Sequence, residues 1–392
     1  MERRRKTGFT AVLRRELRRM VSRRLYFGVC VALPLFCILF MATIFGSGQM
    51  ERIPVGVVDL DWTASSRSVT RTVEAVPTFR VSGHYADEQS ARTATQRKEI
   101  YGYLVIPPRF ETDLRGGRGA TLRYYYHYAL LSVGSEVRGA FETVLQPLAM
   151  TPVVTEAVAL GVSERTAESF LPVSSQSHPL YNPDLDYSVY LSQPFFFILF
   201  QVIVLLVTVY AVGSEIKFRT GDDWLRTAGM NVFSAVAGKL LPYTVIFVLI
   251  SVLANYVLFG VMRIPFSCGF WPLNLTSALF VVATQCLAVF LFSLFPAIGI
   301  VISVVSMVGS LGATLSGVTF PAPFMYEPVY YASFLFPVRH FVEISQNLLY
   351  GDYGFAYTWQ NVAALLLFAL PALLVLPRLK KAVLSRRYEN IK

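Results

Sequence analysis

Six apolar segments, each long enough to cross a lipid bilayer, constrain the fold of this chain more than any other feature. The first, Leu25–Phe45, contains no charged residue and would be about 31 Å long as a helix, which matches the hydrocarbon core of a membrane. A long polar insert separates it from the other five: Pro194–Gly213, Leu240–Val261, Leu275–Phe295, Ala297–Val318 and a last one from about Asn361 to Leu376. The sequence therefore predicts a polytopic α-helical membrane protein with six transmembrane helices and one domain inserted between helices 1 and 2.

Composition and charge support this class. Hydrophobic residues make up 54% of the chain and charged residues only 15%, whereas about a quarter of a soluble domain is charged. The net charge of +10 would suggest nucleic-acid binding if it lay on one soluble face. Instead, residues 1–50 hold ten basic and two acidic residues, while the insert 51–186 holds thirteen basic and sixteen acidic ones. Basic segments beside apolar spans indicate membrane orientation rather than a nucleic-acid partner.

The distribution of basic residues predicts a topology with both termini in the cytoplasm. Counting crossings places the insert 47–192 outside, the loop 214–239 inside, the segment 320–352 outside and a basic tail inside. Residues 1–24 precede the first span, 25–46, and spans 2–6 occupy 193–392. We expect a multi-pass protein with the insert as an extracytoplasmic domain.

The segment before the first span has the pattern of an amphipathic helix. Apolar residues recur at helical spacing, with arginines between them. A few arginines would suffice as an orientation signal, but the regular apolar stripe favours a helix lying in the inner interface, its cations facing anionic headgroups. The stripe consists of Phe9, Val12, Leu13, Leu17, Met20, Val21 and Leu25, and the arginines are Arg14, Arg15, Arg18, Arg19, Arg23 and Arg24.

Short strand-like and helical patterns alternate along the insert, which indicates a small α/β domain with a parallel or mixed sheet. Strands are expected at Ile53–Val58, Thr78–Ser82, Tyr101–Ile106 and Thr121–Tyr126. Helices are expected at Ala64–Val76, started by Thr63 or Ser65, at Asp87–Lys98, from Pro107-Pro108 through Leu114, and from Val133 to about Phe170.

Two groups in the insert could carry chemistry, but structural interpretations fit both better. Asp59 and Asp61 follow a strand and precede a helix, where aspartate commonly caps or turns the chain. The aromatic run Tyr124–Tyr128 alternates faces in a strand, so one side is core, and the other is either core or a surface for a ligand or partner.

Two segments near the fifth span suggest packing and gating. Gly309, Ala313 and Gly317 recur every four residues, which permits close helix approach within the chain or at a dimer seam. The region 320–352 contains proline-broken helices too short to span, and we expect an outer gate or re-entrant region there. Its notable residues are Pro321, Pro323, Pro337, Arg339 and Glu343, with Pro337 placed to start a helix, Gly351 to end it, and Arg339 and Glu343 spaced to pair.

The chain lacks the motifs by which it could power transport itself. The sequence contains no G-x-x-x-x-G-K-[ST] phosphate-binding motif, and its histidines and cysteines show no metal-ligand spacing. The spans carry almost no charge, whereas carriers driven by protons or ions place ionisable groups at mid-membrane. Energy is therefore expected to come from another protein, and we expect no catalytic residue, cofactor or metal in this chain.

Over essentially its whole length the chain resembles the permease subunits of ABC-2-type exporters that carry a large extracytoplasmic domain after the first span. The resemblance rests on short strings in a fixed order: Ile53–Asp59 with Asp61 and Ser66, Val105–Phe110 with Leu114–Gly117, Glu215, Gly238–Pro242, and Phe336–His340 running to Gly351. It departs from the family pattern at Thr220-Gly221, which are reversed, at Ala228, where a proline is usual, and around His127, where an aspartate is usual.

The resemblance implies a bacterial inner-membrane exporter. Two permeases, identical or paralogous, would dock on cytoplasmic ATP-binding subunits that hold ATP and magnesium, with a periplasmic adaptor and outer-membrane channel as further partners. The N-terminal helix and first cytoplasmic loop would couple ATP hydrolysis to the spans, by ion pairs and by burial of Trp224 on the partner. The matching residues are Arg14, Arg18, Glu215, Lys217, Arg219, Asp222, Trp224, Arg226 and Lys239.

Two functions remain open from the sequence. The first is export of a hydrophobic or amphipathic substrate, such as a drug or lipid, because the spans are apolar and aromatic. The alternative is a membrane-anchored receptor or assembly scaffold whose extracytoplasmic α/β domain binds a ligand or partner. Five closely spaced spans after the insert exceed what an anchor requires and favour export.

Overall fold

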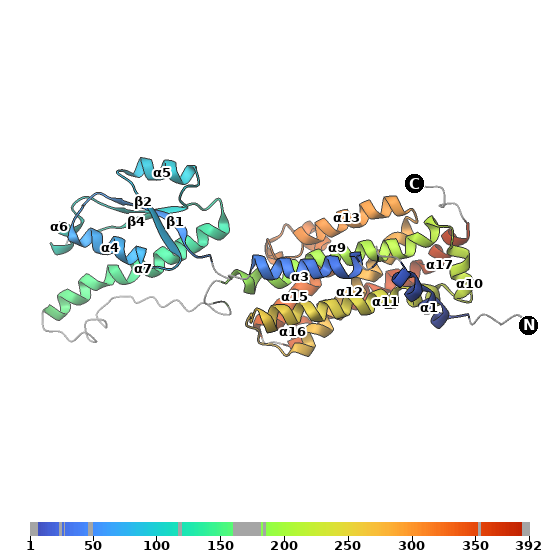
Figure 1. Ribbon diagram of the computed structural model, residues 1–392. Helices are drawn as coiled ribbons and strands as arrows, with labels where there is room; N and C mark the ends of the chain where they lie inside the picture. The colour runs from blue at the N-terminus through green and yellow to red at the C-terminus, as the bar shows by residue number, and fades with distance from the viewer. Residues whose placement is uncertain are drawn as a thin grey trace, which may run out of the picture. The chain divides into compact units, whose positions relative to one another are not determined.

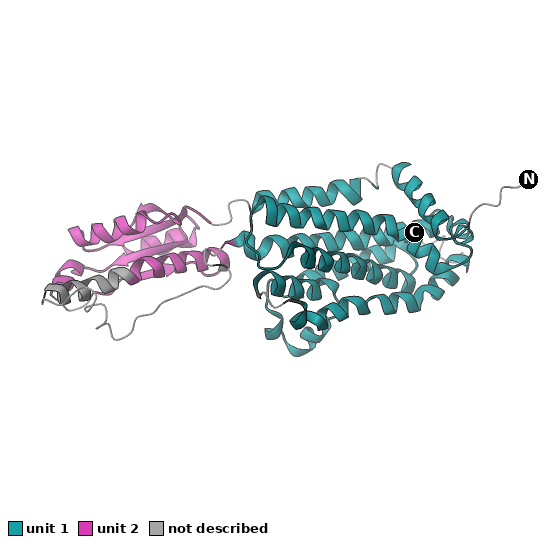
Figure 2. Cartoon of the chain, turned by 90° about the horizontal axis from the view of Figure 1, so that it is seen from below, with its two compact units in different colours: residues 1–48, 187–392 teal, residues 49–186 magenta. Residues whose placement is uncertain are grey.

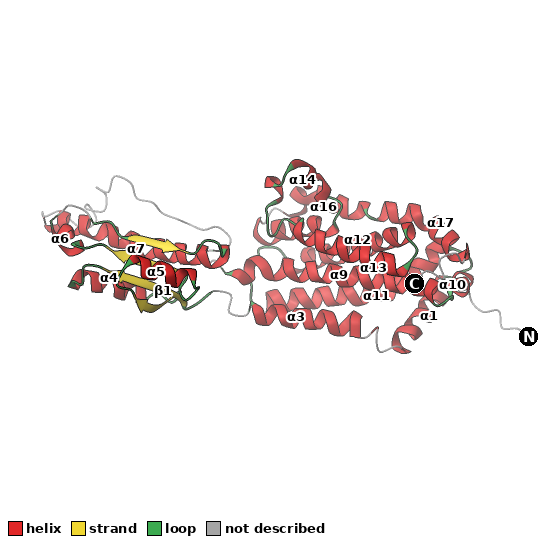
Figure 3. Ribbon diagram, turned by 90° about the horizontal axis from the view of Figure 1, so that it is seen from above, coloured by secondary structure: helices red, strands yellow, loops and turns green. Residues whose placement is uncertain are grey.

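The computed structural model describes residues 7–22, 26, 28–45, 50–116, 120–159, 182, 186–351 and 354–385. The chain forms two compact units (Figure 2), one made of Met1–Gly48 with Tyr187–Lys392 and the other of Gln49–Asp186. We call them the helical unit and the α/β unit. Among the described residues, strands occur in the α/β unit alone (Figure 3). Two expected helices extend beyond the described residues: the N-terminal one at Arg23–Arg24, and the one predicted to run to about Phe170 in its part after Ala159.

Four helices of the helical unit are long and apolar enough to cross a membrane, counted over the described residues. They are α9 (Tyr187–Lys217), α11 (Val232–Asn255) with its continuation η2 (Tyr256–Val261), α12 (Phe270–Leu294), and the stretch Phe355–Ser385, which contains most of α16 (Gly354–Leu367) and all of α17 (Ala369–Ser385). The first and fifth expected spans correspond to shorter apolar helices, η1 (Gly28–Ala32) with α3 (Leu33–Ile44), and α13 (Ile298–Thr314). The protein is a multi-pass membrane protein, and the count of six crossings stays a prediction.

Helix α9 forms the centre of the helical unit, with α3, α12 and α13 packed around it (Figure 1). In the most apolar 18-residue stretch of α9, 72% of the residues are buried, whereas the corresponding share for Phe355–Ser385 is 22%. Aromatic side chains fill the core: Phe197 lies 4.2 Å from Phe341, Phe280 lies 4.8 Å from Phe341, and Phe200 lies 5.6 Å from Phe247, measured between ring centroids. Rings in such offset and edge-on arrangements add attraction to the area they bury.

The small residues of the fifth span pack within the chain. A Cβ added to Gly309 would lie 2.8 Å from Val202 on α9, so the two helices touch at this glycine. Ala313 is partly buried against the same core. Gly317 lies beyond the end of α13 with φ of +91°. The expectation of a helix continuing to Val318 is therefore wrong, because α13 ends at Thr314 and Leu315 is its C-cap.

The segment that follows α13 is broken into short helices, as expected. Pro321 and Pro323 flank and enter the 3₁₀ turn η3 (Ala322–Phe324). Helix α14 (Glu327–Ser333) and helix α15 (Pro337–Gln346) follow, and α15 continues as η4 (Asn347–Gly351). The predicted start at Pro337 and end at Gly351 are confirmed, and Arg339 forms the predicted ion pair with Glu343.

The α/β unit contains a four-stranded mixed sheet in the order β2-β1-β3-β4. Its strands are β1 (Ile53–Asp59), β2 (Phe79–His84), β3 (Gly102–Ile106) and β4 (Arg123–Tyr126). Strand β1 runs parallel to both β2 and β3, while β4 runs antiparallel to β3. The predicted small α/β domain is confirmed, with every strand within two residues of its expected position.

Helices cover both faces of this sheet (Figure 1). On one face, α4 (Ala64–Glu74) and α7 (Leu131–Ala159) bury Val69, Val73 and Phe141 against Val55 and Val57 of β1. On the other face, α5 (Glu88–Gln96) buries its two alanines, Ala91 and Ala94, in a cluster with Val58 of β1 and Tyr103 and Val105 of β3. Successive residues of a strand point to opposite faces, so β1 supplies both cores.

The aromatic run of β4 divides between the two faces. Tyr124 packs 5.3 Å from Phe141 and 6.1 Å from Tyr126, which places both tyrosines on the α7 face. Tyr125 stacks 4.9 Å from Tyr103 on the face covered by α5. Core packing therefore accounts for the α7 face of this run, whereas Tyr125 is 37% exposed and Tyr128 50% exposed, so a surface for a ligand or partner stays a prediction for these two.

Asp59 and Asp61 hold the turn after β1, which confirms the structural interpretation. Asp59 accepts hydrogen bonds from the backbone N–H groups of Asp61 and Trp62, each at 3.0 Å. Asp61 accepts one from the Thr63 hydroxyl at 2.7 Å and another from the N–H of Glu111 at 3.0 Å. Thr63 in turn caps α4, as predicted.

Helix α6 (Phe110–Arg115) begins later than the paired prolines suggested. The residue before it, Arg109, has φ of +66°, and a left-handed residue cannot belong to a right-handed helix. The expected start at Pro107-Pro108 is therefore wrong. The carboxylate of Asp61 satisfies the N–H of Glu111 in the first turn of α6, a group that a helix leaves unpaired.

We predict that Asp61→Ala loosens α6. Removing a capping carboxylate costs about 1 kcal/mol, roughly a fivefold faster opening. Slight burial raises the pKa of Asp61, but hydrogen bonds from Thr63 and Glu111 outweigh it and hold the pKa below its ordinary 3.8. Its contribution is thus present at neutral pH and lost as pH falls below that value. Hydrogen–deuterium exchange of residues 110–115, compared with wild type at each pH, measures the effect.

The exposed Glu99→Gln is the matched control and should leave the exchange of α6 unchanged. Equal exchange in wild type and Asp61→Ala at neutral pH would show that the carboxylate does not hold the helix.

Candidate functional site

Segments from distant parts of the chain converge at one end of the helical unit. They are α1 (Phe9–Ser22), the C-terminal end of α9, the short α10 (Gly221–Thr227) and the first half of α11. Gly238 permits the closest approach, since a Cβ added there would lie 2.9 Å from the carbonyl oxygen of Phe9 and 3.1 Å from Cβ of Val12. The N–H of Gly8 also donates to the carbonyl of Thr227 at 2.8 Å. Helix α1 is therefore fixed to α10 and α11.

Two left-handed turns fix the position of α10. At the end of α9, Arg219 has φ of +57°, and the N–H of Thr220 donates to the carbonyl of Glu215 at 2.9 Å. At the end of α10, Gly229 has φ of +67°, and the N–H of Met230 donates to the carbonyl of Leu225 at 2.8 Å. Both are helix C-terminal motifs that satisfy carbonyls a helix leaves unpaired.

The reversed Thr220-Gly221 pair has a structural reason. The hydroxyl of Thr220 donates to the carboxylate of Glu215. Gly221 is buried, and a Cβ there would lie 2.5 Å from Val383 of α17. A side chain at 221 would therefore push α10 and α17 apart.

Glu215 lies at the centre of a buried charge cluster. Its carboxylate is fully buried and accepts two hydrogen bonds from the guanidinium of Arg15, at 2.8 and 2.9 Å. Arg19 donates to the same carboxylate at 2.7 Å, and the Lys239 ammonium does so at 2.7 Å. Paired arginine–carboxylate geometry of this kind is among the strongest polar contacts in proteins.

Lys239 joins Glu215 to a second carboxylate, that of Glu16 on α1. The Lys239 ammonium lies 2.6 Å from Glu16, and the hydroxyl of Tyr243 donates to Glu16 at 2.8 Å. The side chains of Lys239, Glu16 and Glu215 are all 0% exposed. A charge in such a place is tolerated because each neighbour compensates it, and removing one leaves another unpaired.

Trp224 covers this cluster from α10. Its ring is fully buried, its Nε1–H donates to the carbonyl of Ala235 at 3.2 Å, and the Lys239 ammonium lies 5.6 Å from the ring centroid. The expectation that Trp224 is buried on a partner is therefore wrong for this structure, because the chain's own helices bury it.

The structure brings together three of the predicted coupling residues, Glu215, Trp224 and Lys239. The others lie outside the cluster: Arg14, Arg18, Lys217, Arg219 and Arg226 are exposed, and Asp222 is half-buried. Arg15 and Arg19 turn inward to Glu215, so the expectation that the arginines face headgroups is wrong for these two.

Arg15, Glu16, Arg19 and Tyr243 are the members that sequence reasoning missed. One signal was present. Glu16 follows Val12 by four residues, so an acidic residue falls on the apolar side of an arginine-rich helix. A charge in that position calls for a buried partner.

An apolar pocket of about 210 Å³ lies beside the cluster, between the segment around Tyr26, α9 and α13. The ring of Tyr26 lies 6.0 Å from that of Tyr243 and 6.0 Å from that of Tyr210, so tyrosines separate pocket and charges. The lining residues are Tyr26, Val29, Cys30, Leu206, Val207, Tyr210 and Ile302. Within the described part of the chain, no group of three His, Cys, Asp or Glu side chains could hold a metal ion.

The profile of a family described as "ABC-2 family transporter protein" matches residues 24–376, most of the chain. The chain belongs to this family. Its members are membrane components of ABC transporters and associate with ABC ATP-binding subunits. No curated protein matches the chain in sequence. Helix α1 lies before the matched range, so the match does not include Arg15, Glu16 and Arg19.

We predict that Arg15→Gln and Arg19→Gln each destabilise this ABC-2 transporter. Each loses hydrogen bonds to a buried carboxylate, worth about 1.5–3 kcal/mol. Their neighbours Arg14→Gln and Arg18→Gln remove the same charge from the exposed side of α1 and should stay near wild type. Thermal unfolding midpoints of the purified protein in detergent measure the difference. Equal loss in both pairs would refute the cluster's geometry.

Lys239→Met should be more harmful than either arginine change. It leaves Glu16 and Glu215 without their shared cation, a loss of about 3–5 kcal/mol. The control is Lys217→Met, which changes an exposed lysine at the end of α9. The yield of folded protein and its unfolding midpoint are the readouts, and a Lys239→Met protein as stable as the control would contradict the assignment.

Proposed function

We propose that the protein is the permease of an ATP-driven exporter, and that the buried charge cluster transmits movement from the ATP-binding subunits to the spans. Support comes from the family match and from the buried ion pairs of Glu215 and Lys239, which join α1 to the end of α9 and the first half of α11. A helix pair joined by buried ion pairs moves as one body, because separating it would expose unpaired charges to a poorly solvating interior.

The docking surface proposed for the ATP-binding subunits is the exposed side of the α9–α11 connection. It combines charges of both signs, Lys217, Asp223 and Arg226, with the large apolar side chains of Phe218, Met230 and Phe233, which are 41–48% exposed. Aromatic anchors surrounded by charged groups are typical of protein interfaces. Those subunits would hold ATP and magnesium. They would lie on the cytoplasmic side of the membrane, the side on which both termini of this chain are also proposed to lie.

The cargo proposed is hydrophobic or amphipathic. The spans are apolar, and the pocket beside Tyr26 is lined by apolar side chains. Along α9, buried polar atoms of Gln193, Gln201 and Thr208 have no hydrogen-bond partner in the described chain. These residues recur about every two helical turns, and buried polar groups of this kind require water or a ligand. They would line a path toward the proline-broken outer segment.

A second permease copy or paralogue completes the proposed exporter, as do a periplasmic adaptor and an outer-membrane channel where the envelope has two membranes. The α/β unit would then lie outside the bacterial inner membrane. Because Gly309 packs against α9 within the chain, a dimer would use other surfaces than that glycine.

We predict that Arg226→Glu uncouples the exporter. Reversing the charge on the proposed docking surface places like charges together at the interface, a cost of several kcal/mol, so subunit binding should weaken by at least about tenfold. Co-purification of the ATP-binding subunit and ATP-dependent uptake into inverted vesicles measure it.

Arg263→Glu makes the same change at an exposed residue one span away, and should bind and transport normally. Full transport by Arg226→Glu would overturn this docking surface. Loss of transport in both Arg226→Glu and Arg263→Glu would instead indicate general damage by charge reversal.

A further inference from the structure

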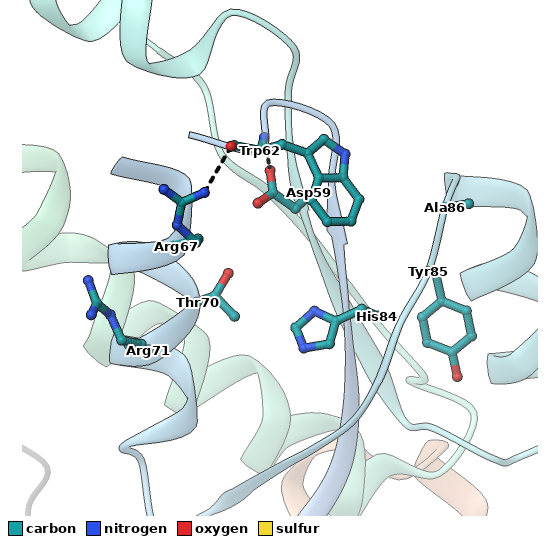
Figure 4. Close-up of a pocket in the computed structure, with 8 residues that line it drawn as sticks. All are labelled: Asp59, Trp62, Arg67, Thr70, Arg71, His84, Tyr85 and Ala86. Atoms are coloured by element: carbon teal, nitrogen blue, oxygen red, sulfur yellow. Dashed lines mark hydrogen bonds between the residues drawn. The ribbon is translucent and has the colours of Figure 1, made fainter. Parts of the chain in front are cut away.

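The α/β unit contains a pocket of about 500 Å³ that neither the sheet core nor the charge cluster explains (Figure 4). It lies beside α4, at the carboxyl ends of strands β1 and β2. Its lining residues are Asp59, Trp62, Arg67, Thr70, Arg71, His84, Tyr85 and Ala86. A cavity of this volume is large enough for a small organic molecule.

A β-bulge directs His84 toward this pocket. The register between β1 and β2 pairs Val55 with Val81 and then Gly56 with Gly83, so Ser82 is skipped. His84 therefore pairs with Val57, whose side chain faces α4, and points across the pocket toward Thr70 (Figure 4). Without the bulge His84 would fall on the opposite face. Bulges that redirect a side chain in this way concentrate at functional sites.

Trp62 forms the rim of the pocket in an unfavourable state. Its φ is +55° and its side chain is 71% exposed. The carboxylate of Asp59 accepts its N–H at 3.0 Å, and the guanidinium of Arg67 donates to its carbonyl at 3.0 Å. A left-handed tryptophan with its indole in water costs stability, and such strain persists where surrounding contacts impose it and function uses it.

One cation of the pocket lining, the guanidinium of Arg71, has no partner among the described residues. The guanidinium of Arg71 makes no hydrogen bond or ion pair with any residue that the structure describes. Asp59, the carboxylate of the lining, already accepts hydrogen bonds from Asp61, Trp62 and the Ser66 hydroxyl.

One further acidic residue lies near the pocket. Glu74 is 4.0 Å from His84, with both side chains about half exposed, so this contact is weak.

We propose that this pocket binds a small amphipathic anion. Its carboxylate, sulfonate or phosphate would lie between Arg71 and His84, where a guanidinium provides two parallel donors. Its apolar part would stack on the exposed indole of Trp62, as aromatic and aliphatic groups do on tryptophan. This assignment concerns the α/β unit alone and does not depend on the proposed export function.

Titration of the full-length protein in phosphatidylcholine nanodiscs with 4-nitrobenzoate tests the proposal. The probe carries the required anion and quenches indole fluorescence, and Trp62 is the sole tryptophan of residues 49–186. Saturable quenching is expected, and Trp62→Phe should abolish it. The neutral 4-nitrobenzyl alcohol should bind at least tenfold more weakly.

The double variant Arg71→Gln/His84→Gln should weaken 4-nitrobenzoate binding at least tenfold. Arg92→Gln removes an exposed charge from α5, on the opposite face of the sheet, and should bind as wild type. Equal thermal midpoints of the variants would show that folding is intact. Absence of saturable quenching, unchanged affinity in the double variant or equal loss in Arg92→Gln would overturn the proposal.

Nanodiscs that contain phosphatidylglycerol distinguish two sources of the same anionic chemistry. Unchanged affinity for 4-nitrobenzoate assigns the pocket to a dissolved anion. Competitive weakening that disappears in Arg71→Gln/His84→Gln assigns it to a lipid headgroup, and either result retains the anion site.

Discussion

The ammonium group of Lys239, held between two buried carboxylates, is the contact on which the helical unit depends. Glu16 belongs to α1 and Glu215 to the end of α9, while Lys239 itself lies on α11, so one side chain joins three helices. Because none of these charges reaches solvent, separating the helices would leave each in a medium that solvates ions poorly. The arginines of α1 strengthen the same joint, and α10 is held against it by Trp224. This end of the bundle therefore behaves as one body.

Much of the architecture followed from patterns that act locally. Apolar runs of sufficient length gave helices, and alternation bounded by turn residues gave the four strands, because burial periodicity and capping are properties of short segments. Thr63 and Ser65 were the two predicted starts of α4 for this reason, and the hydroxyl of Thr63 accepts the capping hydrogen bond from the N–H of Ser66. The turn held by Asp59 and Asp61 was equally readable. The end of α13 was not, since the apolar run continues to Val318, beyond the last helical residue, Thr314.

The sequence indicated Glu215, Trp224 and Lys239 but not the arginines that pair with Glu215, since Arg15 and Arg19 lie about two hundred positions away from it along the chain. Arg14 and Arg15 are neighbours of the same type, yet only Arg15 faces Glu215. Which side of an amphipathic helix turns inward depends on what it packs against, here the bare backbone at Gly238. Likewise, the bulge that redirects His84 depends on one skipped residue in a strand pairing, and strand register is set by tertiary packing.

If the buried charges make α1 and α11 one rigid body, the distance between the two helices stays constant when ATP is hydrolysed. Spin labels at Arg18→Cys and Ala237→Cys, both exposed sites, can be placed in a background whose native cysteines are replaced. Pulsed EPR would compare the nucleotide-free exporter with the vanadate-trapped state in the presence of its ATP-binding subunits. We expect one narrow distance distribution that is the same in both states. A shift or broadening on trapping in the otherwise wild-type protein would contradict it.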